Sequence, residues 1–190
     1  MTTIHSRLSA LLLCCASLAA GASHADDAST EAAPLAAIAS LDVPRYMGTW
    51  YEIARFPNSF QKKCVGFATA SYSLNPEGKV DVLNRCKMAN GQSDQAMGDT
   101  RQIGGASSAK LQVRFAPSWM SMLPMVWGDY WVIDLDADYK LAAVSEPKRK
   151  YLWILSRTTT VDPQTYAALL QRLSKQGFDI SKLETTRQTN

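Results

Sequence analysis

Histidine is nearly missing from this sequence, and the copies it has lie at one end. Only two of the 190 residues are histidine, His5 and His24. If the segment that holds them is removed during export, the remaining chain has none. Ser-His-Asp and Cys-His catalysis are then excluded, as are zinc and haem sites with histidine ligands. We therefore expect no catalytic residues, no metal site and no cofactor.

Blocks of like charge are missing as well. Lysine and arginine number 20 and aspartate and glutamate 17, so the net charge is only +3, and the two signs are interspersed. A surface for nucleic acid needs clustered basic residues, so we expect no nucleic-acid partner. Hydrophobic residues make up 46% of the chain, which is enough for one domain with a buried core.

Residues 1–25 are predicted to be a cleaved secretory signal peptide. An apolar run over residues 8–20 follows a short polar start, and Ala25 ends a small-x-small cleavage site. The run is too short for a convincing transmembrane helix. A lipoprotein signal is the less favoured alternative, because neither Cys14 nor Cys15 follows the small residue typical of lipid attachment.

The mature chain divides into a linker and one domain. Residues 26–40 are rich in alanine, serine and acidic residues and have no hydrophobic period, which predicts a flexible linker. The folded domain is expected over residues 41–190.

Alternating segments predict that this domain is all-β. The first strand, residues 48–56, should place every second residue from Trp50 to Phe56 on one face. Further strands with short turns between them are expected at residues 68–74, 79–86, 93–103, 109–115, 129–135, 139–145 and 150–157. Eight short strands indicate either a sandwich or an antiparallel barrel.

One amphipathic helix follows the strands. Asp162 is a natural N-cap, Pro163 suits the first helical position, and Gly177 suits the C-terminal cap. Its apolar stripe consists of Tyr166, Leu169, Leu170 and Leu173. We expect this stripe to pack on the outside of the sheet, and a last short strand at residues 184–188.

Two cysteines remain after the signal peptide, Cys64 and Cys86, and an even count in an exported chain points to a disulfide. The turn at residues 75–78 sets the pairing of the two strands it joins, and counting back puts Cys86 opposite Phe67. A bend at Gly66 would bring the two cysteines within the distance that a disulfide requires.

The order of these features resembles the lipocalins. Gly48-Thr49-Trp50 opens the first strand, Asp136 lies in the turn after the sixth, and Arg157 ends the eighth, directly before the helix. The segments 41–56, 70–74 and 151–157 look like the bacterial lipocalin and apolipoprotein D branch. The similarity covers about residues 41–188.

The resemblance implies an eight-stranded antiparallel up-and-down barrel with the C-terminal helix outside, closed at one end and open at the other. It implies that Trp50 and Arg157 form a structural floor, with the guanidinium over the indole face. It also implies that certain side chains point into a ligand cavity: Tyr72, Asn84, Phe115, Tyr130, Tyr151, Trp153 and Leu155.

The predicted loop at residues 116–128 is apolar, although it should lie at the open end. It contains Trp119, Trp127 and three methionines and no charged residue. Loops are normally polar. Three interpretations stay open: a lid over the cavity, a contact with a membrane surface, or an interface with a partner protein.

The family resemblance implies an exported bacterial protein of the periplasm. It would bind a lipophilic ligand, a fatty acid or a lysophospholipid, for lipid storage, transport or membrane maintenance; an outer-membrane lipoprotein is the less favoured location. The alternative is an enzyme of the same fold, such as an isomerase or de-epoxidase. Its reactive group would have to be a free thiol of Cys64 or Cys86, or a buried carboxylate such as Glu52.

Overall fold

The computed structural model describes residues 33–189 of the chain. The predicted signal peptide, its lipoprotein alternative at Cys14 and Cys15, and the first part of the predicted linker lie outside these residues. In the remaining part of that linker the chain is packed against the domain: Leu35 is 7% exposed, and the Ile38 N–H donates to the Val132 carbonyl at 2.9 Å. Within residues 33–40 the segment therefore belongs to the domain.

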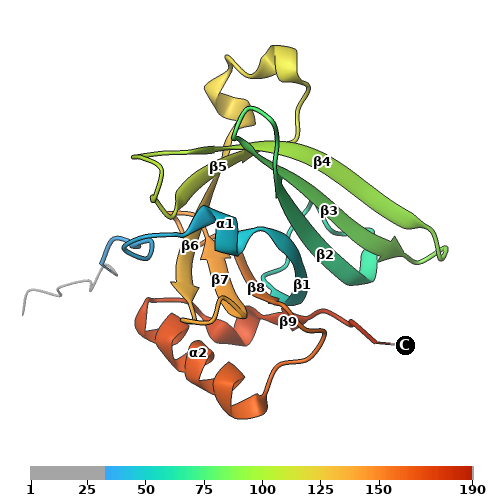
Figure 1. Cartoon of the computed structure of the whole chain (residues 1–190). Helices are drawn as coiled ribbons and strands as arrows, with labels where there is room; N and C mark the ends of the chain where they lie inside the picture. Colours follow the sequence, from blue (N-terminus) through green and yellow to red (C-terminus); the bar gives the residue numbers. More distant parts are fainter. Residues whose placement is uncertain (1–32, 190) are drawn as a thin grey trace, which may run out of the picture. The chain divides into compact units, whose positions relative to one another are not determined.

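Eight antiparallel strands form a closed barrel (Figure 1). Their bounds are β1 Gly48–Arg55, β2 Cys64–Leu74, β3 Val80–Met88, β4 Ser93–Gln102, β5 Lys110–Arg114, β6 Gly128–Leu135, β7 Leu141–Ser145 and β8 Leu152–Ser156. Each strand pairs with the next along the chain, and β1 pairs with both β2 and β8. The up-and-down barrel is confirmed, and the sandwich is not formed.

The predicted helix is α2, Pro163–Lys175, and it lies outside the barrel (Figure 1). The Asp162 side chain accepts a hydrogen bond from the Thr165 N–H and so caps its first turn. Leu169 and Leu173 are fully buried against the outer face of the barrel. The amphipathic stripe thus makes a second core outside the barrel, as expected.

Short elements complete the chain. Helix α1, Val43–Tyr46, precedes the first strand, and the 3-10 helices η1, Ser118–Met120, and η2, Pro124–Val126, lie in the loop before β6. The helix η3, Ile180–Lys182, and the two-residue strand β9, Glu184–Thr185, follow α2. None of the described helices is long and apolar enough to cross a membrane.

The first strand differs from its prediction in one respect. Its pairing with β8 shifts between Glu52 and Ala54, which is a β-bulge at Ile53. Trp50 and Glu52 face the barrel interior, but Ala54 and Phe56 pack in the outer core beneath α2. The prediction that one face holds every second residue to Phe56 was therefore wrong, because a bulge reverses the alternation.

Candidate ligand-binding cavity

The barrel encloses a cavity of about 610 Å³, which lies in the size range of small-molecule sites. It runs from α1 at the closed end to the loops before β2 and β6 at the open end. All seven residues that the sequence points inward line it: Tyr72, Asn84, Phe115, Tyr130, Tyr151, Trp153 and Leu155. The geometry brings them together, and their role in binding stays a prediction.

Sequence reasoning missed a further part of the apolar wall. It comes from small and medium apolar side chains that alternate along β2, β3 and β5: Ala70, Val80, Val82, Leu111 and Val113. Every second residue of a half-buried strand faces inward, so if Tyr72 points into the cavity, Ala70 two residues earlier on β2 should do so as well. The signal was present in the alternation.

The closed end is built around Arg157. Its guanidinium lies 3.9 Å from the centre of the Trp50 ring and donates to the carbonyls of Met47 and Thr49 at 2.8 and 3.0 Å. Further bonds reach the carbonyls of Arg45 and Tyr46. Gly48 has φ +95°, and a Cβ there would lie 3.3 Å from the guanidinium, so glycine fits this approach. Trp50 and Arg157 therefore form the floor that the resemblance implies.

Three tyrosine hydroxyls meet above this floor; we call Tyr46, Tyr72 and Tyr130 the tyrosine cluster. The Tyr130 hydroxyl lies 2.7 Å from that of Tyr72 and 3.0 Å from that of Tyr46. Burial raises the pKa of Tyr72 to about 12 and also raises the pKa values of the other two. Tyr72 and Tyr130 were expected to face the cavity, but their contact with Tyr46 was not predicted, because the three residues come from β2, β6 and α1.

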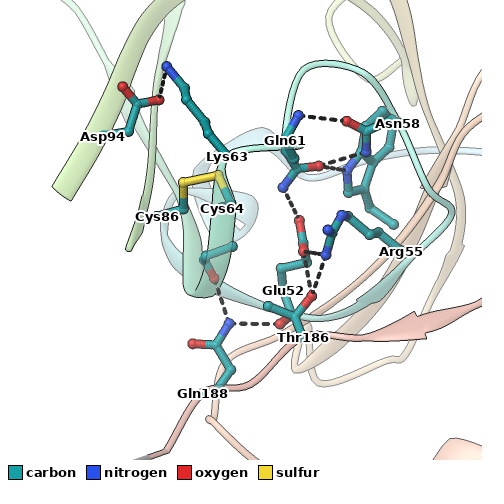
Figure 2. Close-up of a disulfide and its surroundings, with 12 residues drawn as sticks. Glu52, Arg55, Asn58, Gln61, Lys63, Cys64, Cys86, Asp94, Thr186 and Gln188 are labelled. Carbon is teal, nitrogen blue, oxygen red and sulfur yellow. Dashed lines mark hydrogen bonds and ion pairs between the residues drawn. A yellow bond between two sulfur atoms is a disulfide. The ribbon is translucent and has the colours of Figure 1, made fainter. Parts of the chain in front are cut away.

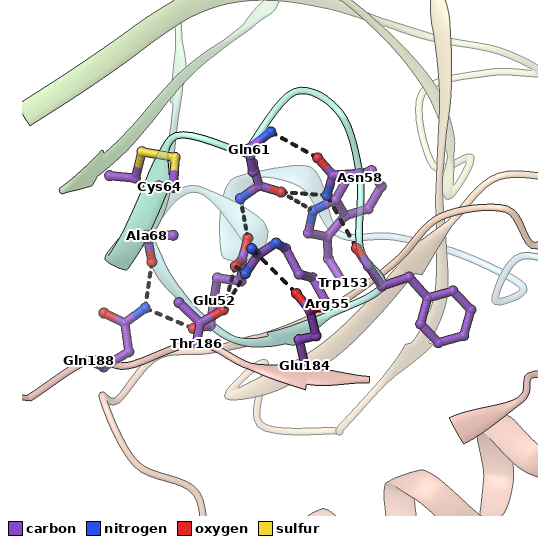
Figure 3. A network of polar contacts seen from close by, with 12 residues as sticks. Glu52, Arg55, Asn58, Gln61, Cys64, Ala68, Trp153, Glu184, Thr186 and Gln188 are labelled. Atoms are coloured by element: carbon purple, nitrogen blue, oxygen red, sulfur yellow. Dashed lines mark hydrogen bonds and ion pairs between the residues drawn. A yellow bond between two sulfur atoms is a disulfide. The ribbon is translucent and has the colours of Figure 1, made fainter. Parts of the chain in front are cut away.

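A second polar group, the Glu52 network, lies in the cavity wall (Figures 2 and 3). The buried Glu52 carboxylate accepts from Gln61 Nε2 at 2.6 Å, from Arg55 Nη1 at 3.2 Å and from the Thr186 hydroxyl. Gln61 Oε1 accepts from the indole N–H of Trp153 at 3.0 Å. The charge of the carboxylate is thus balanced by that of Arg55, and three side chains donate hydrogen bonds to it. Through Gln61, the network ties the cavity wall to the loop before β2 at the open end.

The C-terminal segment fills a seam in the wall. Beyond the pair Tyr51 and Thr69, strands β1 and β2 separate, and residues 184–188 run between them. The Thr186 N–H donates to the Ile53 carbonyl at 2.9 Å. The side-chain amide of Gln188 bridges the carbonyls of Glu52 and Ala68, at 2.7 Å each (Figure 3). This segment therefore replaces the missing β1–β2 hydrogen bonds.

The predicted disulfide between Cys64 and Cys86 is confirmed (Figure 2). Their Cα atoms lie 5.6 Å apart, and the pairing of β2 with β3 shifts on both sides of Gly66. Gly66 and Phe67 have φ values of +149° and +53°, which produce the expected bend. Because both sulfurs are bonded, neither cysteine provides the free thiol that the enzyme alternative would use.

The loop at residues 116–128 extends away from the barrel (Figure 1). Trp119 is 78% exposed and Met122 and Met125 are each 87% exposed. Trp127 is different, since it lies under the guanidinium of Arg101 and its indole N–H donates to the Ser121 carbonyl. The three most exposed apolar side chains therefore point to solvent and do not cover the cavity as a lid.

Comparison with known proteins agrees with this architecture. A family model described as a lipocalin-like domain matches residues 41–188. The structure of insecticyanin from the tobacco hornworm Manduca sexta is similar, with a TM-score of 0.63 and 20% identity, and the match covers 82% of this chain and 85% of that one. At this identity the likeness shows the fold alone.

Relatives that are similar in sequence include a plant, a bacterial and a mammalian protein. Temperature-induced lipocalin-1 of Arabidopsis thaliana is 42% identical over 163 residues, covering 85% of this chain and 87% of the relative. Outer membrane lipoprotein Blc of Escherichia coli (strain K12) is 38% identical, and the match covers 75% of this chain and 77% of the relative. Apolipoprotein D of Mus musculus is 34% identical, covering 80% and 79%. The chain therefore belongs to the lipocalin family, with bacterial Blc and apolipoprotein D among its relatives.

Proposed function

We propose that this protein binds one fatty acid or lysophospholipid in the barrel cavity and acts by carrying or sequestering it, in lipid transport, storage or membrane maintenance. The observation that carries the proposal is the cavity itself, which is large enough for an acyl chain and lined mainly by apolar and aromatic side chains. We propose the periplasm as its location. The E. coli relative is named an outer membrane lipoprotein, which supports a place in the cell envelope.

Burial of an acyl chain supplies enough free energy for this function. Each buried methylene contributes about 0.8 kcal/mol, so ten contribute about 8 kcal/mol before the costs of association. A dissociation constant of about 1 μM corresponds to about 8 kcal/mol. Chain length should therefore influence affinity more than the chemistry of the headgroup does.

Titration of delipidated protein with fatty acids and lysophospholipids of increasing length tests the proposal. Trp153 lines the cavity, so its fluorescence should change as the ligand enters. We expect saturable binding that strengthens with chain length. Folded protein that binds none of these ligands would contradict the proposal.

A pair of matched variants locates the site. Trp153→Glu places a charge in the cavity wall and should abolish binding, since a buried unpaired carboxylate is costly. Trp119→Glu makes the same substitution on an exposed side chain outside the cavity, so affinity should stay unchanged. Binding should be followed by calorimetry here, because the first variant removes the fluorescent reporter. Equal affinities in the two variants would place the ligand elsewhere.

We propose binding without catalysis. This proposal is supported by the bonding of the residues that the enzyme alternative would need as reactive groups. Cys64 and Cys86 form a disulfide, and the Glu52 carboxylate accepts hydrogen bonds from three side chains. Recovery of chemically unchanged ligand after prolonged incubation is the expected result, measured by mass spectrometry of an organic extract.

We also propose that the loop at residues 116–128 contacts a membrane surface. Trp119, Met122 and Met125 form an exposed apolar group at the open end, and tryptophan favours the membrane–water interface. A ligand that leaves the cavity at this end would then enter a bilayer directly. An interface with a partner protein is the competing use of the same side chains.

Vesicle flotation separates these two uses. Replacement of Trp119 and Met122 by serine should weaken association with phospholipid vesicles and leave affinity for soluble ligands unchanged. Met97→Ser is the control, because Met97 is 63% exposed on β4, outside the loop. Vesicle association that survives the loop substitutions would contradict the membrane contact.

A further inference from the structure

The tyrosine cluster has one more proton than its hydrogen bonds use. Three hydroxyls carry three protons, but the cluster forms two bonds, from Tyr130 to Tyr46 and from Tyr130 to Tyr72. The count is independent of which hydroxyl donates in each bond. Among the described residues, no other group accepts a hydrogen bond from these three hydroxyls. One O–H is therefore left over in every arrangement of the protons.

This O–H is available to a ligand. All three tyrosines line the cavity, and Tyr46 packs on Trp50 with 4.8 Å between the ring centres, so the cluster lies at the closed end. Burial raises the pKa of each hydroxyl, to about 12 for Tyr72, and so the protons stay in place at physiological pH. A methyl group packed against a buried O–H would leave this donor unsatisfied, which costs affinity.

The charges around the cavity decide what kind of acceptor suits this donor. The floor guanidinium of Arg157 is occupied by Trp50 and by backbone carbonyls. Arg85 is the only basic residue among the described residues that line the cavity, and it is an exposed position near the open end of β3, one residue before Cys86 of the disulfide. A carboxylate at the closed end would be buried near the guanidinium of Arg157, whose hydrogen bonds are already given to backbone carbonyls, so the carboxylate would lack a direct cationic partner, which is unfavourable. A neutral oxygen carries no such penalty.

We propose that the closed end of the cavity is a subsite for a neutral oxygen, a ketone or hydroxyl near the tail of the bound amphiphile, and that the tyrosine cluster donates a hydrogen bond to it. This inference rests on the proposed function, because the ligand is the same amphiphile with its charged group at the open end. It adds a chemical class: oxygenated acyl chains are bound in preference to plain chains of the same length.

Matched pairs of fatty acids test the subsite. Plain acids of ten to eighteen carbons are compared with acids of equal length that carry a ketone on the carbon before the terminal methyl, by calorimetry with delipidated protein. At the chain length that reaches the cluster, the acid with the ketone should bind more tightly than the plain acid. In a Tyr46→Phe, Tyr72→Phe, Tyr130→Phe variant, the ratio of the two affinities should shift against the ketone by about tenfold or more.

Tyr151→Phe is the matched control. Tyr151 lines the same cavity but lies outside the cluster and stacks on Trp153. Its substitution removes one cavity hydroxyl and should leave the affinity ratio unchanged. A ratio that is the same in wild type and in the triple variant at every chain length would overturn the subsite and leave the proposed function standing. Failure of all the acids, plain and oxygenated, to bind folded protein would overturn both.

A spectroscopic measurement needs no variant. The ketone carbon is labelled with ¹³C, and the infrared band of its carbonyl is compared between the wild-type complex and a hydrocarbon solvent. A hydrogen bond from the tyrosine cluster should lower the carbonyl frequency. A carbonyl band at the frequency found in the hydrocarbon solvent would overturn the proposal. Because this measurement uses only the wild-type protein, it tests the proposal even if the triple variant does not fold.

Discussion

Reduction of the disulfide is expected to destabilise the barrel by an amount that follows from the length of the loop it closes. Cys64 and Cys86 are 22 residues apart. In the chain-entropy model a loop of this length corresponds to about 11 cal/mol/K, or about 3.4 kcal/mol at 25 °C. For a domain of this size each kcal/mol changes the melting temperature by about 2–4 °C, so reduction should lower it by about 7–14 °C.

Thermal unfolding followed by circular dichroism, with and without a phosphine reductant, measures this effect. The Cys64→Ser, Cys86→Ser double variant is the control. It should melt at the temperature of the reduced wild type and should not respond to the reductant. A change of less than about 1 kcal/mol in wild type would refute the reasoning, because the bridge would then not stabilise the fold by restricting the unfolded chain.

The remaining predictions concern the floor, the cavity wall and the tyrosine cluster. Arg157→Lys should lower the free energy of unfolding by about 2 kcal/mol in urea denaturation, because an ammonium cannot stack on Trp50 and serve the floor carbonyls together; an unchanged midpoint would contradict this. Glu52→Gln should cost about 3 kcal/mol, because it leaves the largely buried Arg55 with only the exposed Glu184 as a charged partner, whereas Glu184→Gln, which removes that exposed partner 3.7 Å from the guanidinium, should cost less than about 1 kcal/mol; equal costs would refute this reasoning from burial. The pKa values of the tyrosine cluster lie above the ordinary 10, so the protonated cluster contributes its full stability to the fold below pH 10, and this contribution should be lost as the pH rises toward 12. Absorbance at 295 nm measures the ionisation of the tyrosines. If it showed all seven tyrosines ionising near pH 10 in folded protein, the prediction would be excluded.

Features with a local cause could be predicted from the sequence. Alternation set the strands, and Asp162 with Pro163 set the start of α2. The disulfide followed from counting back along one hairpin, although the observed pairing starts with Leu74 opposite Val80 and shifts twice near Gly66. The interior residues also followed from alternation together with the family resemblance. In these cases neighbours in the chain determine the geometry.

Features that join distant segments and that the family resemblance does not imply could not be predicted. The bulge at Ile53 left no mark, because the residues on both faces of β1 include large apolar groups. The tyrosine cluster draws on three elements, and Tyr46 and Tyr130 lie 84 residues apart. Glu52 was visible as a buried acid, but its partner Thr186 comes from the other end of the domain. Only the closed barrel brings these side chains together.

The seam between β1 and β2 has a consequence for the order of folding. The segment that fills it, residues 184–188, follows every strand of the barrel and the helix along the chain. One edge of β1 pairs with β2, but its other edge pairs with β8, which follows about 100 residues later in the chain. Contacts between segments so far apart form slowly, because the intervening chain must be ordered first. We therefore expect the wall around the cavity to be completed late, and the nascent barrel to stay open until then along the edge that carries Glu52.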